Sequence, residues 1–180
     1  MGKRSNGLMD PVRLKPFRGV EDGLVRVVIE TPKGSRNKFA FNEDEHIFEL
    51  KRVLPAGMAF PYDFGFVPST KADDGDPIDV LVLMDEPAFP GCVLKCRIIG
   101  VIEGEQSNKK MKERNDRILA VEHEAHSWAD VKTADDLGKK FREELEEFFE
   151  DYHQLSGQQF RALGVKGPDR AKKLIRAAMR

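Results

Sequence analysis

The run DDGDPID at 73–79 brings four carboxylates into one short turn. Gly75 and Pro77 force a tight course on the backbone, and carboxylates held this close repel one another. A folded protein tolerates such a cluster when the side chains splay into water, are countered by Lys or Arg, or hold a cation. Carboxylate oxygens suit hard cations such as Mg²⁺. From the spacing alone, a solvated acidic turn and a metal site are both open interpretations.

Basic residues elsewhere in the chain could complete a phosphate-binding site. Lys38, Arg52 and Arg117 fall on expected strands, although each of them alone is also explained as an ordinary surface charge. The acidic turn opens directly into an apolar strand, so Asp79 must lie near the core. Metal-binding carboxylates faced by Lys and Arg are the arrangement that phosphoryl chemistry requires, since the transferred group and its leaving group are both anionic. The combination therefore favours a metal site over a plain acidic turn.

Short strands separated by turns dominate residues 24–121. Apolar and β-branched runs predict strands at 24–31, 38–41, 47–54, 79–84, 93–103 and 117–121. The segment 58–68 holds several aromatic residues, but its Pro and Gly content predicts an irregular buried connection rather than a central strand or a helix. Residues 105–115 are expected to form a polar loop. Strands this close in sequence favour a barrel or sandwich over alternating β and α units.

Helices are expected after the strands. Thr133 is a candidate N-cap, with Asp136 three residues later in a variant of the capping box. Apolar residues then recur at spacings of four and three, at Leu137, Phe141, Leu145, Phe148 and Tyr152. Pro168 suits the first turn of a last helix. The predicted fold class is α+β, mainly β, with C-terminal helices packed against the β-core. The expected organisation is an N-terminal arm at 1–22 and a single domain at 23–180.

The composition excludes some classes of protein. The chain has 180 residues, of which 40% are hydrophobic and 34% charged, and its net charge is −1. A nucleic-acid-binding domain usually shows a clear excess of Lys and Arg, so no nucleic-acid partner is expected. The apolar runs are far shorter than the roughly 20 residues that span a bilayer. No apolar stretch of a signal peptide follows the first residues. These features predict a cytoplasmic protein without a membrane partner.

The run DGDPIDVLV at 74–82 resembles the signature of the family I soluble inorganic pyrophosphatases at every position. The similarity extends over about 24–155 and includes the runs VIETP, FPYDFGFVP and FFEDY. The resemblance implies a five-stranded, OB-like β-barrel with helices packed against it. It also implies hydrolysis of pyrophosphate to two phosphates with Mg²⁺, or with Mn²⁺ or other divalent ions as alternatives. By resemblance to short bacterial members, the protein is expected to be a homo-oligomer, a hexamer.

The same resemblance implies roles for individual residues. The metal ligands would be Asp74, Asp76, Asp79 and, through water, Glu30. Asp76 would also accept the proton of the attacking water, the pKa of which is lowered by the metal. The residues that hold phosphate oxygens would be Lys38, Arg52 and Tyr152.

Several positions depart from the family pattern. The changed positions are Ala40, Phe60, Phe64, Asn115, Arg117 and His153. Asn115 stands in place of a metal-binding aspartate, so Asp116 is the candidate replacement ligand, with Glu105 or Glu113 as the source of another carboxylate. His153 replaces a lysine and could meet a phosphate when protonated, while Arg117 takes the place of a second lysine. The loop before 117 is also longer than in the family pattern. These changes predict a divergent, slower or differently metalled member.

Two other functions are consistent with the sequence. An enzyme with the same metal chemistry could hydrolyse another small diphosphate or a nucleoside polyphosphate, since the aromatic segment 58–66 could accommodate a larger group. An OB-like barrel could instead bind a single-stranded oligonucleotide on its strand face. The near-zero net charge and the acidic cluster argue against the oligonucleotide. Turnover of pyrophosphate and ATP would separate the two enzymes.

Overall fold

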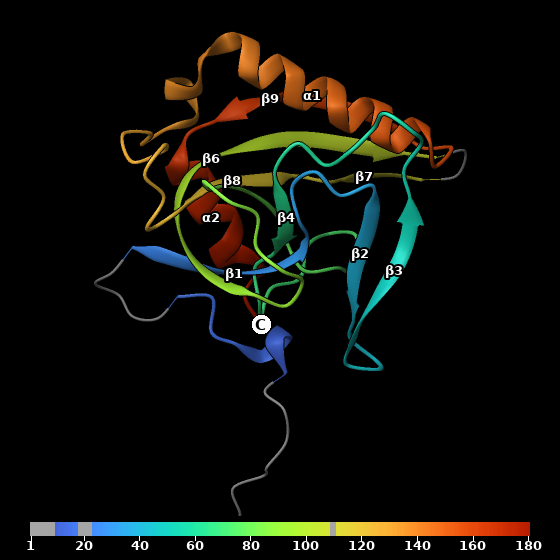
Figure 1. Cartoon of the computed structure of the whole chain (residues 1–180), viewed down its shortest axis with the longest axis horizontal. Coiled ribbons are helices and arrows are strands. Elements are labelled where there is room, and N and C mark those ends of the chain that lie inside the picture. The colour runs from blue at the N-terminus through green and yellow to red at the C-terminus, as the bar shows by residue number, and fades with distance from the viewer. Residues whose placement is uncertain (1–9, 18–22, 109–110) are drawn as a thin grey trace, which may run out of the picture.

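Five strands close into a ring, as Figure 1 shows. The structure is a computed structural model that describes residues 10–17, 23–108 and 111–180. The ring runs in the order β1 (Leu24–Thr31), β4 (Asp63–Phe66), β5 (Asp79–Leu83), β8 (Arg117–Glu122) and β6 (Val93–Ser107), and β1 pairs with β6 to close it. β5 and β8 run parallel, whereas the other neighbouring pairs run antiparallel. The prediction of a mainly β, barrel-like fold is confirmed.

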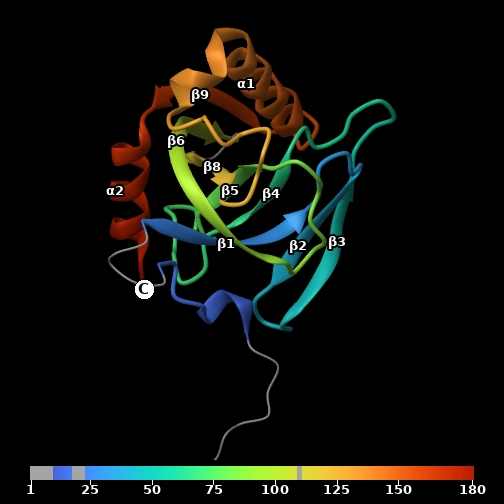
Figure 2. The ribbon, with the colours of Figure 1, turned by 60° about the vertical axis from the view of Figure 1, so that its left-hand side comes forward.

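The helices cover different sides of the ring (Figure 2). They are η2 (Ala134–Leu137), a short 3-10 turn, followed by α1 (Gly138–Gln154) and α2 (Pro168–Ala178). Leu81 and Leu83 of β5 belong to the core that packs against α1, whereas Val80 and Val82 belong to the core that packs against α2. Because alternate residues of a strand face opposite sides, the four residues of β5 that follow Asp79 must all be apolar. This requirement explains the apolar run that follows the acidic turn.

The helix starts follow the sequence signals closely. The backbone N–H of Thr133 donates to the carboxylate of Asp136 over 2.7 Å, so the capping interaction forms as predicted. It caps the 3-10 turn, and α1 itself begins only at Gly138. Pro168 lies in the first turn of α2, where its missing N–H is not needed.

The segment 58–68 contains a central strand at 63–66, so the prediction of an irregular connection is wrong in part. β4 lies between β1 and β5, and all four of its residues are buried. Pro61 and Pro68 fall outside the strand. A Cβ atom on Gly65 would lie 2.0 Å from the carbonyl oxygen of Val28, which shows that only glycine permits this approach of β4 to β1. The glycine is therefore a requirement of the central position.

Asp63, at the start of β4, fixes the strand to two neighbouring loops. Its carboxylate accepts the N–H of Lys33 over 2.8 Å and the N–H of Ala88 over 2.7 Å, and the side chain is buried. We expect Asp63→Ala to lower the free energy of unfolding by about 2–4 kcal/mol, because each unpaired buried donor costs about 1–3 kcal/mol. Urea titration measures this loss. The exposed Glu124→Ala is the control, and equal unfolding midpoints for the two variants would contradict the expectation.

Two further strands extend the sheet from β6. β7 (Lys112–Arg114) pairs with the end of β6, and β9 (Gln159–Lys166) pairs with its second half. The prediction of a polar loop at 105–115 is therefore wrong in part, since β6 continues through Ser107 before the chain turns back into β7. The sequence of β9 lacks a β-branched run, and its strand conformation depends on the pairing with β6.

A separate hairpin stands beside the ring (Figure 2). It consists of β2 (Asn37–Asn42) and β3 (Ile47–Val53). The N–H of Phe41 donates to the carboxylate of Glu30 over 2.8 Å, and the N–H of Phe39 donates to the hydroxyl of Thr31 over 3.0 Å. These two hydrogen bonds join the hairpin to the end of β1.

The N-terminal arm predicted at 1–22 is described only in part, because residues 1–9 and 18–22 lie outside the described residues. Within it, η1 (Pro11–Arg13) is a 3-10 turn, and Phe17 forms a β-bridge with Val25 of β1. None of the helices in the described part of the chain is long and apolar enough to span a bilayer.

Candidate active site

One large cavity, of about 760 Å³, collects almost every residue that the sequence analysis singled out. Its lining includes Glu30, Lys38, Arg52, Asp74, Asp76, Asp79, Arg117, Tyr152 and His153. These residues come from β1, the β2–β3 hairpin, the acidic turn before β5, the start of β8 and the end of α1. Asp116 does not line this cavity and lies at a smaller one, of about 150 Å³.

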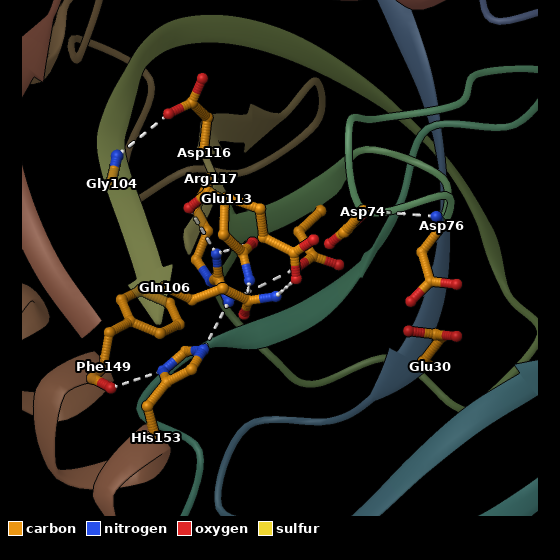
Figure 3. A network of polar contacts seen from close by, with 12 residues as sticks. Glu30, Asp74, Asp76, Gly104, Gln106, Glu113, Asp116, Arg117, Phe149 and His153 are labelled. Atoms are coloured by element: carbon orange, nitrogen blue, oxygen red, sulfur yellow. Dashed lines mark hydrogen bonds and ion pairs between the residues drawn. The ribbon is translucent and has the colours of Figure 1, made fainter. Parts of the chain in front are cut away.

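The acidic turn, residues 71–79, is shaped by backbone hydrogen bonds. The N–H of Ala72 donates to the carbonyl of Asp76 over 2.7 Å, and Gly75 takes a φ of +93°, which favours glycine. The N–H of Asp76 donates to the carboxylate of Asp74 over 3.1 Å. Figure 3 shows the side chain of Asp76 pointing toward that of Glu30. The tight turn thus directs Asp76 into the cavity.

Asp79 and Arg117 meet because two parallel strands begin side by side. Val80 of β5 is paired with Ile118 of β8, so the preceding residues, Asp79 and Arg117, lie next to each other in the cavity lining. A guanidinium nitrogen of Arg117 lies 3.6 Å from a carboxylate oxygen of Asp79. Burial raises the pKa of Asp79, while the charges of Arg117 and Lys38 lower it.

The buried side chain of Arg117 is held by Asn115 and by two aromatic rings. Its Nη1 donates to the backbone carbonyl of Asn115 over 2.7 Å and also to the side-chain oxygen of Asn115. The guanidinium lies 4.8 Å from the ring centre of Phe149 and 5.2 Å from that of Phe160. Nε finds no hydrogen-bond partner among the described residues. A buried cation with a free donor is suited to binding an anion.

Lys38 and Glu30 form a second buried pair of opposite charges. The Lys38 ammonium lies 3.8 Å from the Glu30 carboxylate and 4.0 Å from the ring centre of Phe64. Burial lowers the pKa of Lys38 and raises that of Glu30, and each charge opposes the shift of the other. Phe64, one of the departures from the family pattern, thus provides the aromatic face on which the lysine rests.

Arg52 lies directly across the hairpin from Lys38. Its guanidinium is 5.6 Å from the ring centre of Tyr152, and one of its nitrogens donates to the hydroxyl of Ser156. Burial raises the pKa of Tyr152, so its phenol is protonated at neutral pH and can donate a hydrogen bond. The hairpin and the end of α1 therefore present two cations and a phenol to one side of the cavity.

His153 lies deep in the cavity wall, against Arg117. Its Nδ1 is 2.7 Å from the carbonyl oxygen of Phe149, and its Nε2 is 3.3 Å from a guanidinium nitrogen of Arg117 (Figure 3). Burial, followed by the charge of Arg117, lowers the pKa of His153 to about 4. An imidazole with this pKa is neutral at neutral pH, whereas the sequence analysis expected a protonated His153 to meet a phosphate.

The carboxylates proposed for the loop before β8 do not reach the cavity lining. Asp116 accepts the N–H of Gly104 over 3.0 Å and pairs with Arg114 at 2.8 Å. Figure 3 shows its side chain pointing away from Asp74 and Asp76. Glu105 pairs with Lys112 at 2.6 Å. Asp116 therefore shares only the smaller cavity with Asp74 and Asp79 of the acidic turn, and Glu105 lines neither of these two cavities.

Uncharged amides line this side of the cavity. Asn115 donates its amide to the side-chain oxygen of Gln106, and Gln106 donates to the carboxylate of Glu113 over 2.6 Å. Gln106 and Asn115 both line the cavity. The sequence analysis missed Gln106 because it carries no charge and belongs to no motif. To place Gln106 at the cavity, the strand predicted at 93–103 would have had to be extended to Ser107.

The carboxylates of the cavity are a suitable donor set for a hard cation. Burial, together with the neighbouring charges of Asp79 and Asp76, raises the pKa of Asp74 to about 6. Within the described ranges, no three His, Cys, Asp or Glu side chains converge closely enough to enclose an ion. Mg²⁺ keeps several of its waters when bound, so carboxylates that share one cavity without converging still fit it. An all-oxygen set of this kind favours Mg²⁺ or Mn²⁺ over softer metals.

Comparisons with known proteins agree with this geometry. Residues 27–180 match the family described as Inorganic pyrophosphatase. The inorganic pyrophosphatase of Synechocystis sp. is 41% identical over 153 residues, covering 85% of this chain and 88% of that protein. The inorganic pyrophosphatase of Geobacillus stearothermophilus is 37% identical over 155 residues, covering 86% and 92%. The crystal structure of inorganic pyrophosphatase from Thermus thermophilus has a TM-score of 0.85 and 31% identity, covering 94% and 97%. The chain therefore belongs to the family I inorganic pyrophosphatases.

Proposed function

We propose that this inorganic pyrophosphatase hydrolyses pyrophosphate to two phosphates in the 760 Å³ cavity. One observation carries the proposal: anionic and cationic side chains line different parts of the cavity wall. Carboxylates of the acidic turn and β1 face it from one part, and three buried or half-buried cations face it from the hairpin and β8. The reaction needs both, because the substrate is an anion that must be bound while a water molecule attacks it.

The carboxylates are proposed to hold divalent metal ions, with Mg²⁺ as the working ion and Mn²⁺ as an alternative. The residues that would hold them are Asp74, Asp76 and Asp79, with Glu30 acting through water. When bound, the ions supply positive charge that neutralises phosphate oxygens and makes an attacking water more acidic. Asp116 is not included, since its carboxylate is engaged by Gly104 and Arg114.

The chain's own residues orient the reactants. Asp76 has a carboxylate directed into the cavity, and we assign to it the acceptance of the proton that the attacking water loses (Figure 3). Lys38 and Arg52 are paired across the hairpin and bind oxygens of one phosphoryl group, with the phenol of Tyr152 as a further donor. Arg117 binds oxygens from the side of β8. Positioning of this kind, together with electrostatic stabilisation, supplies most of the rate enhancement in phosphoryl transfer.

Assembly and cellular context extend the proposal. We propose that residues 23–180 form one domain, that the protein works in the cytoplasm, and that it assembles as a homo-oligomer, a hexamer. Light scattering after size exclusion tests the assembly directly. The acidic turn and the net charge of −1 do not favour an oligonucleotide-binding function.

Phosphate release from pyrophosphate tests the activity. We expect turnover with Mg²⁺ and its loss after EDTA treatment, followed by recovery when Mg²⁺ is added in excess, because the carboxylate set works only around a cation. ATP, the control substrate, is expected to be hydrolysed at least about tenfold more slowly. Absence of phosphate release with any of Mg²⁺, Mn²⁺, Co²⁺ or Zn²⁺ would reject the proposed function, and faster release from ATP would reassign the substrate.

A further inference from the structure

Arg117 contacts His153, a residue that has no role in the proposed function. Asn115 fixes Nη1 through two oxygens, and two aromatic rings fix the plane of the guanidinium. The other nitrogen, Nη2, lies between Asp79 at 3.6 Å and the Nε2 atom of His153 at 3.3 Å. His153 thus contacts the edge of the guanidinium that also faces the acidic turn.

The direction of the hydrogen bonds around His153 follows from chemistry. Arginine donates and never accepts, so Nε2 of His153 must be the acceptor for Arg117. The carbonyl of Phe149 accepts and never donates, so Nδ1 must carry the proton that it receives at 2.7 Å. One neutral tautomer satisfies both partners, and a helix carbonyl holds the ring in place. The imidazole is therefore a fixed acceptor aimed at Arg117.

We propose that His153 is a positioning residue, which acts by accepting a hydrogen bond from Arg117 and thereby orienting the guanidinium toward the substrate phosphate. The inference rests on the proposed function, since Arg117 is taken to bind substrate. His153 itself makes no contact with phosphate in this arrangement, because both of its ring nitrogens are occupied by protein partners. Its position beside a permanent cation also suits an uncharged acceptor, since a cationic side chain would repel the guanidinium.

Packing is the alternative role for this side chain. The imidazole stacks on Phe160 at a centroid distance of 4.9 Å and an interplanar angle of 22°. Two substitutions separate packing from hydrogen bonding. His153→Phe keeps an aromatic ring on Phe160 but removes the acceptor. His153→Gln loses the ring but can place its side-chain oxygen near the position of Nε2.

We expect His153→Phe to lower kcat/KM for pyrophosphate about 30-fold, mainly through KM, because a misoriented group that binds phosphate weakens both ground and transition state. His153→Gln is expected to stay within about threefold of the unmodified enzyme. Circular dichroism and thermal melting establish that both variants are folded. The reverse order, with Phe active and Gln impaired, would overturn the proposal in favour of packing.

Arg117→Met provides a second, independent measurement. In that background there is no guanidinium to orient, so adding His153→Phe is expected to change kcat/KM by less than about threefold. A loss of about 30-fold in both backgrounds would overturn the proposal, and His153→Leu replaces the Phe variant if that one fails to fold. Phosphate release by the unmodified enzyme is measured in the same assay. If the unmodified enzyme releases no phosphate, the proposed function is refuted. If it does, and the effects of His153→Phe and Arg117→Met on kcat/KM are additive, only the role of His153 is refuted.

Discussion

Asp76→Asn is expected to lower kcat for pyrophosphate hydrolysis by about a thousandfold while the protein stays folded. Asparagine keeps the shape of the side chain but cannot accept the proton of the attacking water, and it is a poorer metal ligand. General base catalysis alone contributes about 10²–10⁴-fold, which corresponds to roughly 3–5 kcal/mol in the barrier. Phosphate release at saturating substrate and Mg²⁺ measures the effect.

Another aspartate of the acidic turn offers a matched control for Asp76→Asn. Asp73 belongs to the same turn but does not line the large cavity, so Asp73→Asn is expected to retain activity within about threefold. The melting temperature of Asp76→Asn should equal or exceed that of the unmodified protein in the absence of divalent ions, because one of several mutually repelling carboxylates is removed. Equal activity of the two variants would exclude Asp76 as the proton acceptor.

Arg117→Met is expected to reduce both stability and activity strongly. The substitution leaves Asp79 partly buried without its closest cation, and loss of one member of a buried ion pair typically costs about 3–5 kcal/mol. It also removes the residue that we propose binds phosphate from the side of β8, so kcat/KM should fall at least about a hundredfold. Urea titration and phosphate release measure the two effects separately. Arg117→Lys keeps the positive charge and is expected to lose much less stability and activity than Arg117→Met.

The pH dependence of the stability lost in Arg117→Met provides a further test. Burial raises the pKa of Asp79, and the charge of Arg117 lowers it, so the variant should raise it further. A carboxyl group with a higher pKa in the folded state binds more protons there than in the unfolded chain, and stability therefore falls as pH rises through its ordinary value of about 4. Without divalent ions, the loss caused by Arg117→Met should thus be smaller near pH 5 than near pH 8. A loss independent of pH would show that Asp79 does not depend on this partner.

Most of the barrel was predictable because its strands carry their own signals. The β-branched run at 24–31 matches β1, and the apolar run from Asp79 matches β5 to within a residue. β4 escaped prediction because prolines and a glycine normally argue against a central strand. At Gly65 the reason for the glycine is the closeness of Val28 on the neighbouring strand, a contact between segments far apart in sequence. β9 depends in the same way on its pairing with β6.

The candidate site, like the barrel, was predictable where one continuous segment forms it and not where segments distant in sequence meet. The acidic turn is one continuous motif, so its placement at the cavity could be inferred from sequence. The role of Asp116 could not, because whether its carboxylate turns toward the cavity depends on Arg114 and Gly104, which engage it elsewhere. The neutral state of His153 likewise depends on burial beside Arg117. Spacing along the chain does not report either environment.

The parallel pairing of β5 with β8 makes backbone register a determinant of catalysis. Asp79 and Arg117 are adjacent only because their strands start level with each other. Since side chains alternate between the two faces of a sheet, sliding β8 by one residue would turn the guanidinium away from the acidic turn and bring Asp116 or Ile118 to its place. Any change in the number of residues between β6 and β8 must therefore leave the start of β8 level with that of β5 if the pair of Asp79 and Arg117 is to survive.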